Sequence, residues 1–596
     1  MACLAHSLPG SDRTPRRAGT RRTITGLLTA LTLTVACADG EAAAPARDDD
    51  PEALHQAATE CTNSSLVRLW LRFLQLPDAC EPAVRTTPSD PPTPGDATTR
   101  SVTSTTPSER PASPPIDPTS PVERDGGPRF PSAVALPEAQ PWQPPPVGPV
   151  PDLVGAARPE QDQTFPDLGT GAIDVNHYDL DFAWDAAALL LDARATLTLT
   201  TREELGGIPL DFGDQLHVTG TTVSIGGSAA APAISGHLRD KLVVSLSSSV
   251  PAGTTVVISV RYQGEPDAVF SSGAPIPAGW TVQDDGAVGT VSEPDAAHAW
   301  YPCNDHPTDK ATYRTRITVP ANYVGVGNGV QLGSAVSNPD GSVSYSWLMD
   351  APMAPYLALV AIADLTASEQ GTSSGVRLRN FVPRGQESRY AASLAVQPAA
   401  LDFLVQRLGP FPFREYGAVI IPGPRVALET QGRSIFQGDS ALDVVTVVHE
   451  LAHQWMGNSV SLTRWQSDIW WVEGFARYSE WLWLEQTEGP EAYEGRARAA
   501  YDSLADGTGR RLTNMPSGDL FGQAIYDGGA LVYHELRRQL GEQTFFAAMR
   551  AFCTTYRYAN ATSDDLLRTF SEQAGTDVTP WIATLITGAQ LPPRPF

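Results

Sequence analysis

Hydrophobic and polar residues follow two different patterns along this chain. From about residue 165 they alternate, as at residues 195–200 and 255–260, and Gly, Asp and Pro interrupt the alternating runs. A period of two is typical of half-buried β-strands, and the interrupting residues favour turns. The pattern predicts a large all-β N-terminal domain over residues 165–366.

From residue 367 to residue 596 the apolar residues recur at helical spacing instead. Apolar residues at positions i, i+3, i+4 and i+7 indicate amphipathic helices. The predicted fold class is therefore α+β multidomain, with a saddle-like or sandwich-like β domain followed by a mainly α-helical domain. The long segments with helical spacing lie around residues 394–408, 441–457, 470–487, 525–541 and 544–555.

The first 164 residues have a different composition. Residues 81–151 contain 20 of the 52 prolines of the chain, among Ser, Thr and small residues. Such a composition cannot bury a core, so we expect residues 39–164 to form a disordered, Pro/Ser/Thr-rich spacer. One short amphipathic segment within it, near residues 63–76, predicts a helix.

Residues 1–38 have the features of a signal peptide. Five arginines precede an apolar run from Ile24 to Ala36, which is too short to span a bilayer. We expect an exported protein, either secreted or held at the cell envelope. Residues 33–37 resemble a lipoprotein processing box with Thr34 where leucine is usual, but residues 36–38 would equally serve an ordinary signal peptidase. A lipid anchor at Cys37 is therefore an alternative to simple cleavage.

Charge and cysteine content exclude several classes of protein. The net charge of −25 argues against nucleic acid and anionic membranes as partners. Six cysteines in 596 residues make no disulfide scaffold. Cys61 and Cys80 bracket the short helical segment, and in an exported protein they are candidates to pair with each other or with Cys303 or Cys553. We expect none of the cysteines to bind metal.

Candidate chemistry is concentrated in residues 449–473. His449 and His453 stand at positions i and i+4 of an apolar helical segment, so both imidazoles can reach one metal ion at about 2.0–2.1 Å. Glu450 lies beside them, where it can take a proton from a metal-activated water molecule. A second, aromatic helical segment supplies Glu473 as a third, charged ligand.

This set of residues favours a catalytic zinc site over a buried helix with incidental histidines. Two unpaired imidazoles are unfavourable in a core helix, whereas a metal ion gives them partners. Three protein ligands and one open position describe a catalytic zinc, while a structural zinc is closed by four ligands, usually with cysteine. The sequence therefore predicts one zinc ion per chain.

Two segments of this region resemble a known family. HELAHQWMGNSV at 449–460 and DIWWVEGFA at 468–476 are similar to the aminopeptidase N family of zinc metallopeptidases, the gluzincins, which combine HExxH with a downstream Glu. The family pattern places eighteen residues between the second His and the Glu, whereas residues 454–472 make nineteen. We expect the extra residue in a loop at residues 462–467, which would leave Glu473 in place as a ligand.

The resemblance covers about residues 165–596 and implies a thermolysin-like catalytic domain after the β domain. The segments HYDLD at 177–181 and PCNDHP at 302–307 add to it. It also implies that Glu429, in a segment ALET after an apolar strand, binds the free N-terminus of a substrate. Glu293 matches a position where many relatives have Gln as a second amine contact. A carboxylate in a dry cleft can hold an ammonium group through charge-assisted hydrogen bonds.

Two further residues complete the site that the resemblance implies. Tyr526, in the segment YDGGA, is similar to the family's transition-state tyrosine, whose phenol stabilises the oxyanion that forms during hydrolysis. Glu480 lies seven residues after Glu473 on the same helical face and is a candidate to orient a ligand histidine. A solvated helix glutamate is the alternative for Glu480.

The family implies a zinc aminopeptidase acting on peptides with a free N-terminus. Glu450 would take the proton of the attacking water and pass it to the leaving amine. The alternatives are a zinc endopeptidase or an epoxide-opening hydrolase on the same site, and a catalytically silent binding protein that kept the fold. The presence of Glu429 argues against an endopeptidase, and the presence of Glu450 and Tyr526 argues against a silent protein.

Overall fold

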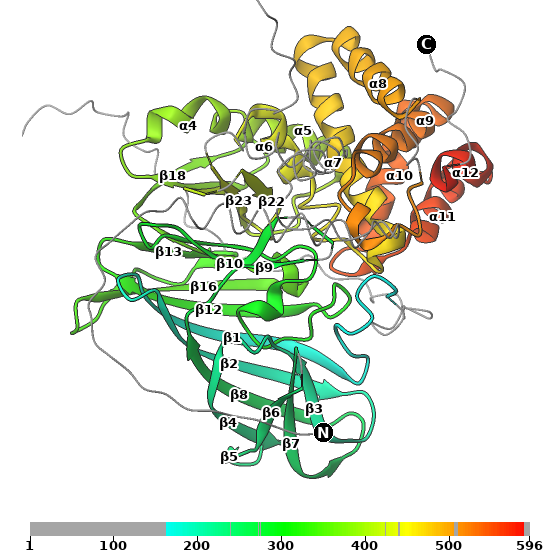
Figure 1. Cartoon of the computed structure of the whole chain (residues 1–596). Coiled ribbons are helices and arrows are strands. Elements are labelled where there is room, and N and C mark those ends of the chain that lie inside the picture. The colour runs from blue at the N-terminus through cyan, green and yellow to red at the C-terminus, as the bar shows by residue number, and fades with distance from the viewer. Residues whose placement is uncertain are drawn as a thin grey trace, which may run out of the picture. The chain divides into compact units, whose positions relative to one another are not determined.

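The structure is a computed structural model. It describes residues 162–588 except 239, 272, 275, 424, 439–441 and 506–510. The predicted signal peptide with Cys37, and the spacer up to residue 161 with Cys61 and Cys80, lie outside the described residues. Figure 1 shows the strands of the N-terminal part in cyan and green and the helices of the C-terminal part in yellow-green to red.

The N-terminal part is built from strands because its apolar residues alternate with polar ones. In β2 (Leu190–Thr201) every second side chain from Leu191 to Leu199 is buried. The neighbouring strand β8 (Thr255–Gly264) buries alternate residues in the same way. The period-two pattern thus gives each strand one face toward the core, as the sequence predicts.

These strands form three sheets. The remaining strands are β1 (Ile173–Asp185), β3 (Leu205–Asp211), β4 (His217–Ile225), β5 (Ala231–Pro232), β6 (Ser235–Leu238), β7 (Lys241–Val250), β9 (Val269–Phe270), β10 (Pro277–Val282), β11 (Val288–Val291), β12 (Ala311–Pro320), β13 (Val324–Gly327), β14 (Val330–Gln331), β15 (Val336–Ser337), β16 (Ser342–Met353) and β17 (Val360–Ala363). The nine-stranded sheet has the order β14-β16-β12-β1-β2-β8-β4-β5, with β15 paired to β16. The other two have the orders β13-β17-β11-β10-β9 and β3-β7-β6.

A further sheet of six strands begins the second part of the chain. Its strands are β18 (Leu365–Gly371), β19 (Arg377–Pro383), β20 (Glu415–Tyr416), β21 (Ala418–Ile421), β22 (Val426–Leu428) and β23 (Ser434–Gln437). Their order is β18-β19-β21-β23-β22, with β20 paired to β19. Strand β18 spans the predicted boundary at 366/367. The second domain therefore contains a sheet as well as helices. Strands β21 and β23 of this sheet are buried along their whole length and show no alternation.

Two helices lie between β19 and β20 in the chain, and the other helices follow the sheet and carry most of the site. They are α4 (Glu387–Leu394), α5 (Gln397–Leu408), α6 (Val444–Ala452), α7 (Trp465–Glu488), α8 (Pro490–Ala505), α9 (Gly529–Leu540), α10 (Glu542–Thr555), α11 (Ser563–Ala574) and α12 (Thr579–Thr587). A pair of short strands, β24 (Ser461–Leu462) and β25 (Asn560–Ala561), connects two of the intervening loops. No helix of the described residues has the length and apolarity needed to cross a bilayer.

The six-stranded sheet supports the helix with the two histidines. Ala418 and Ile420 of β21 form a buried cluster with Val447 of α6, while Val419 and Ile421 on the other face of the strand join the main core. Strand β22 packs beside β23 and ends at Leu428, directly before Glu429. The same sheet therefore determines where the Glu429 segment begins and where α6 lies.

Helices α7 and α9 approach each other at a pair of glycines. A Cβ atom on Gly474 would lie 2.5 Å from the Cα atom of Gly529, and one on Gly529 would lie 2.4 Å from the carbonyl oxygen of Trp470. Any side chain at either position would force the two backbones apart. This contact sets the distance between α7, which carries Glu473, and the turn before α9, which carries Tyr526.

The two cysteines in the described part are buried and free. Cys303 lies in the β domain and Cys553 on α10. Burial raises the pKa of both thiols, to about 12 for Cys553. Both therefore act as small apolar core residues rather than as reactive thiols.

Candidate active site

Helix α6 presents His449 and Glu450 to the site because its other side packs into the core. Asp443 caps the helix by accepting a hydrogen bond from the Thr446 backbone N–H at 2.8 Å. Val447, Val448 and the following apolar residues of the helix are buried against the protein interior. The predicted helical segment 441–457 placed His453 within the helix. The helix ends earlier, at Ala452, so His453 is its C-cap residue.

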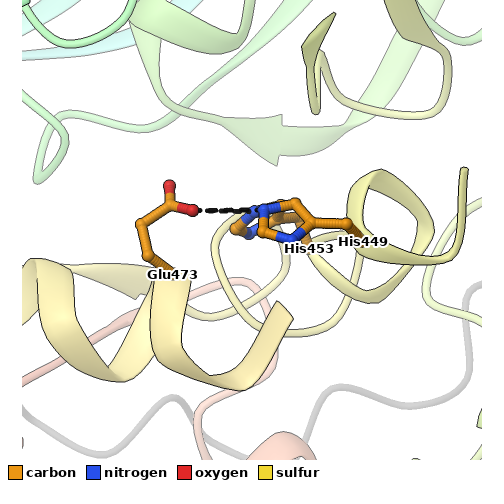
Figure 2. A group of neighbouring side chains, drawn as sticks. All are labelled: His449, His453 and Glu473. Atoms are coloured by element: carbon orange, nitrogen blue, oxygen red, sulfur yellow. Dashed lines mark hydrogen bonds and ion pairs between the residues drawn. The ribbon is translucent and has the colours of Figure 1, made fainter. Parts of the chain in front are cut away.

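Glu473 of α7 meets both histidines at one point. Its Oε2 atom lies 3.2 Å from Nε2 of His449 and 3.5 Å from Nε2 of His453 (Figure 2). One ligand atom from each of the three residues falls within 4.8 Å of the others. All three residues are buried, and the nineteen-residue spacing leaves Glu473 facing the two imidazoles.

The outer nitrogens of both histidines are already occupied. Nδ1 of His449 lies 2.8 Å from Oε1 of Glu480, and Nδ1 of His453 lies 3.1 Å from the carbonyl oxygen of Met456. Such bonds orient each ring and keep the proton on Nδ1. The Nε2 lone pairs of both rings are thereby left for a metal ion.

Three more carboxyl groups are buried around this point. Glu293, Glu429 and Glu450 each have one side-chain oxygen without a hydrogen-bond partner among the described residues. Burial, with the repulsion of neighbouring carboxylates, raises the pKa of Glu293 well above its usual value and that of Glu450 to about 8. The pKa of Glu429 is also raised, first by burial. A positive charge at the centre of this group would stabilise the ionised form of each carboxyl.

The charges of the three triad residues depend on one another. Burial opposes the charged form of Glu473, but the two histidines outweigh it and lower its pKa to about 2. Burial likewise opposes the charged form of His449, yet Glu473 and Glu480 raise its pKa to about 10. In the absence of metal the carboxylate thus attracts protons to the imidazoles. A metal cation bound between the imidazoles and Glu473 would replace these protons and neutralise the charge of the carboxylate.

Glu429 is held through its backbone by the metal helix segment. Nε2 of Gln454 donates to the Glu429 carbonyl at 3.0 Å, and Nδ2 of Asn458 donates to the same oxygen at 2.6 Å. Gln454 also accepts from the backbone N–H of Gly432 at 2.8 Å. The segments that carry Glu429 and His453 are therefore fixed to each other.

Tyr526 lies in a turn of π-helix, Ala524–Gly528. Its ring centroid is 6.0 Å from that of His449. Burial and the nearby carboxylates raise the pKa of its phenol well above the usual value, so it remains a hydrogen-bond donor. Single turns of π-helix are frequent at functional sites, because the wider turn re-aims a side chain.

One residue at the site was not predicted from the sequence. Arg477 of α7 donates from Nη1 to both oxygens of Glu480, at 3.1 and 2.8 Å. Its guanidinium carbon lies 5.6 Å from the ring centroid of Tyr526. The sequence does contain a signal for it, since Glu473, Arg477 and Glu480 are spaced by four and three residues and share one helix face.

The residues present fit a zinc ion. Two imidazole Nε2 atoms and one carboxylate oxygen are the donor set of a catalytic zinc site with an open position. One oxygen each of Glu429 and Glu450 has no hydrogen-bond partner among the described residues, and burial raises the pKa of both groups, so a cation at the centre of the site would stabilise their charged forms. Only His449, His453 and Glu473 form such a ligand group in the described residues.

Comparison with known proteins gives the family. The Peptidase M1 N-terminal domain model matches residues 174–357, and the Peptidase family M1 domain model matches residues 415–584. The chain is 25% identical over 428 residues to Aminopeptidase M1-D of Oryza sativa subsp. japonica, covering 67% of this chain and 48% of the relative. It is 26% identical to Endoplasmic reticulum aminopeptidase 1 of Homo sapiens, covering 48% of this chain and 33% of the relative. The chain thus spans about half or less of the length of these relatives.

Solved structures cover more of the fold. An M1 zinc metallopeptidase from Deinococcus radiodurans matches with a TM-score of 0.67 and 27% identity, over 74% of this chain and 99% of the other. A mutant of that enzyme bound to a Tyr-Ser-Ala substrate matches with a TM-score of 0.67 and 28% identity, over 74% and 100% of the two chains. A β-rich domain followed by a helical domain with an HExxH and glutamate triad defines the two-domain zinc metallopeptidase fold. This chain belongs to peptidase family M1, the aminopeptidase N family.

Proposed function

We propose that the protein is a zinc-dependent aminopeptidase, which releases the N-terminal residue of a peptide. The observation that carries this proposal is Glu429. The residue is 2% exposed, and its carboxyl group interacts electrostatically with His453 and Glu473 and has one oxygen without a partner among the described residues. An ammonium group supplies both the charge and the hydrogen bonds that such a carboxylate lacks. An internal peptide bond offers no such cation.

The total charge of the site supports the same substrate. Glu293, Glu429, Glu450 and Glu473 bring four carboxylates into one buried region. A zinc ion with neutral histidines brings two positive charges to these four groups. A substrate cation next to the scissile bond would further stabilise the ionised forms of Glu429 and Glu293, whose pKa values burial raises. Glu293 is the second group that we assign to the ammonium.

The residues of the chain divide the reaction among them. The chemistry that zinc supplies when bound is polarisation of the scissile carbonyl and acidification of a water molecule. Glu450 accepts the proton of that water and later delivers it to the leaving amine. Tyr526 donates a hydrogen bond to the oxyanion as it develops. Glu480 keeps His449 in the tautomer that offers Nε2 to the metal.

Solved relatives support a peptide substrate. Besides the Tyr-Ser-Ala complex, mutants of the two-domain M1 zinc metallopeptidase bound to L-tryptophan and L-arginine match this chain with TM-scores of 0.67. The test is an assay of purified protein with measured zinc content against a panel of aminoacyl fluorogenic amides. We expect activity that disappears on chelation and returns with zinc. Turnover that is unaffected by complete removal of metal would contradict the proposal.

We also propose that the protein is exported, on the evidence of residues 1–38 alone. Mass spectrometry of the protein from expressing cells should find a mature N-terminus near residue 38. The variant Cys37→Ser separates the two routes, because it blocks lipid attachment and permits ordinary cleavage. An N-terminus that still begins at Met1 on protein outside the cytoplasm would contradict cleavage.

A further inference from the structure

One cation links the two groups that flank the metal triad. The guanidinium of Arg477 binds Glu480, which in turn binds Nδ1 of His449. The same guanidinium faces the ring of Tyr526 and lies 3.4 Å from the carboxylate of Asp527. Arg477 thus contacts helix α7, which it shares with Glu480, and the π-helical turn that holds Tyr526.

The contact with Glu480 has a direct electrostatic consequence. Glu480 is buried, and both of its oxygens accept from Arg477 while one also faces His449. Without the guanidinium, this buried carboxylate would lose its cationic partner and would be freer to rotate. Nη1 of Arg477 donates to both carboxylate oxygens and so fixes the orientation of Glu480 against His449. The orientation of a metal ligand therefore depends on this arginine.

The contact with Tyr526 acts on the other side of the metal. A cation 5.6 Å from a phenol ring stabilises negative charge that develops where the hydroxyl donates. The ion pair with Asp527 restrains the turn from which Tyr526 projects. Loss of the cation should therefore disturb both the position of the phenol and the field around it.

We propose that Arg477 is a positioning residue of the reaction, which couples the orientation of the metal ligand His449, through Glu480, to the placement of the oxyanion donor Tyr526. The inference rests on the proposed function and deepens it. It requires two separable effects of one substitution. Zinc should bind more weakly, and the zinc-saturated enzyme should turn over more slowly without a matching change in KM.

The test compares Arg477→Gln with a matched control, Arg538→Gln. Arg538 also pairs with a buried glutamate three residues away, Glu535 on α9, where its Nε and Nη2 atoms each donate to one carboxylate oxygen. Among the described residues, no hydrogen bond or ion pair joins Arg538 to a residue of the site. Zinc affinity is measured by competition with a chelator, and kcat and KM are measured at saturating zinc on one aminoacyl amide. We expect about 10-fold weaker zinc binding and about 10-fold lower kcat in Arg477→Gln only, with KM within about twofold.

Two more variants make the outcome decisive. Arg477→Lys keeps a cation within reach of both groups, so it should recover most of both losses. Arg477→Met keeps the apolar part of the side chain. If the Gln variant does not fold, zinc affinity, kcat and KM are measured on the Met variant instead. Unchanged zinc affinity and kcat, an effect on only one of them, or an equal effect in Arg538→Gln would overturn the coupling. If the wild type releases no amino acid, the proposed function is wrong. The zinc affinity of the variants would still test whether Arg477 orients His449 through Glu480.

Discussion

Replacing Gly474 by alanine tests whether the approach of two helices sets the catalytic geometry. The added Cβ would lie 2.5 Å from Cα of Gly529 and 2.6 Å from its carbonyl carbon, whereas ordinary contact begins near 3.4 Å. The neighbours are backbone atoms, so no side chain can rotate away. The helices must separate by about 1 Å, which is the difference between these distances. Glu473 is the residue before Gly474, and Tyr526 lies three residues before Gly529.

The two energetic terms of this substitution oppose each other. Overpacking typically costs about 1–3 kcal/mol, while alanine gains about 1 kcal/mol over glycine inside a helix. We therefore expect a net loss of at most about 2 kcal/mol in the free energy of unfolding, so Gly474→Ala should fold. A misplacement of about 1 Å can lower turnover about 10²-fold, and we expect a fall in kcat of that order.

The assay pairs thermal unfolding with kcat at measured zinc content. Gly495→Ala on α8 is the control, because a Cβ there meets nothing within 4 Å and should stabilise the helix by up to about 1 kcal/mol without changing kcat. Wild-type kcat in a folded, zinc-loaded Gly474→Ala variant would refute the idea that this contact places Tyr526.

Two further predictions concern the base and a buried ion pair. Glu450→Gln should retain zinc but lose at least about 10²-fold in turnover, because the amide cannot accept the water proton; a metallated variant with wild-type turnover would remove Glu450 from the mechanism. His298 pairs with Asp305 at 2.8 Å, and although burial opposes its charge, Asp305 raises its pKa from 6.5 to about 9. A raised pKa stabilises the fold below pH 6.5 and loses that effect as the pH rises through about 9. Wild type should therefore exceed His298→Gln by up to about 3 kcal/mol at low pH, and denaturation at several pH values should show this excess vanish by about pH 10.

Local patterns in the sequence were sufficient for the elements that have a strict period. Alternation along residues 195–200 predicts β2, and helical spacing predicts α5, α7 and α10 near their observed bounds. The six-stranded sheet was not predicted as a layer, because β21 and β23 are buried on both faces and read as short apolar runs. Helices α4, α8, α11 and α12 were also missed.

The candidate site divides in the same way. The spacing of His449, His453 and Glu473 could be read from the chain, because two helix faces determine where these side chains point. The helix end at Ala452 and the π-helical turn at Tyr526 could not, since both depend on tertiary packing around them. The contacts of Arg477 with Tyr526 join residues 49 positions apart, and no local pattern reports such a contact.

The central claim is that Glu429 binds the free N-terminus of the substrate. The most direct measurement is kcat/KM for one aminoacyl amide with a free and with an N-acetylated amine, on wild type and on Glu429→Ala at equal zinc content. Losing a desolvated charged pair costs about 2–5 kcal/mol, so wild type should prefer the free amine by about 30-fold or more. Glu429→Ala should lose that preference by losing rate on the free-amine substrate only. Equal wild-type rates on the two substrates, or cleavage inside blocked peptides, would contradict the account and indicate an endopeptidase.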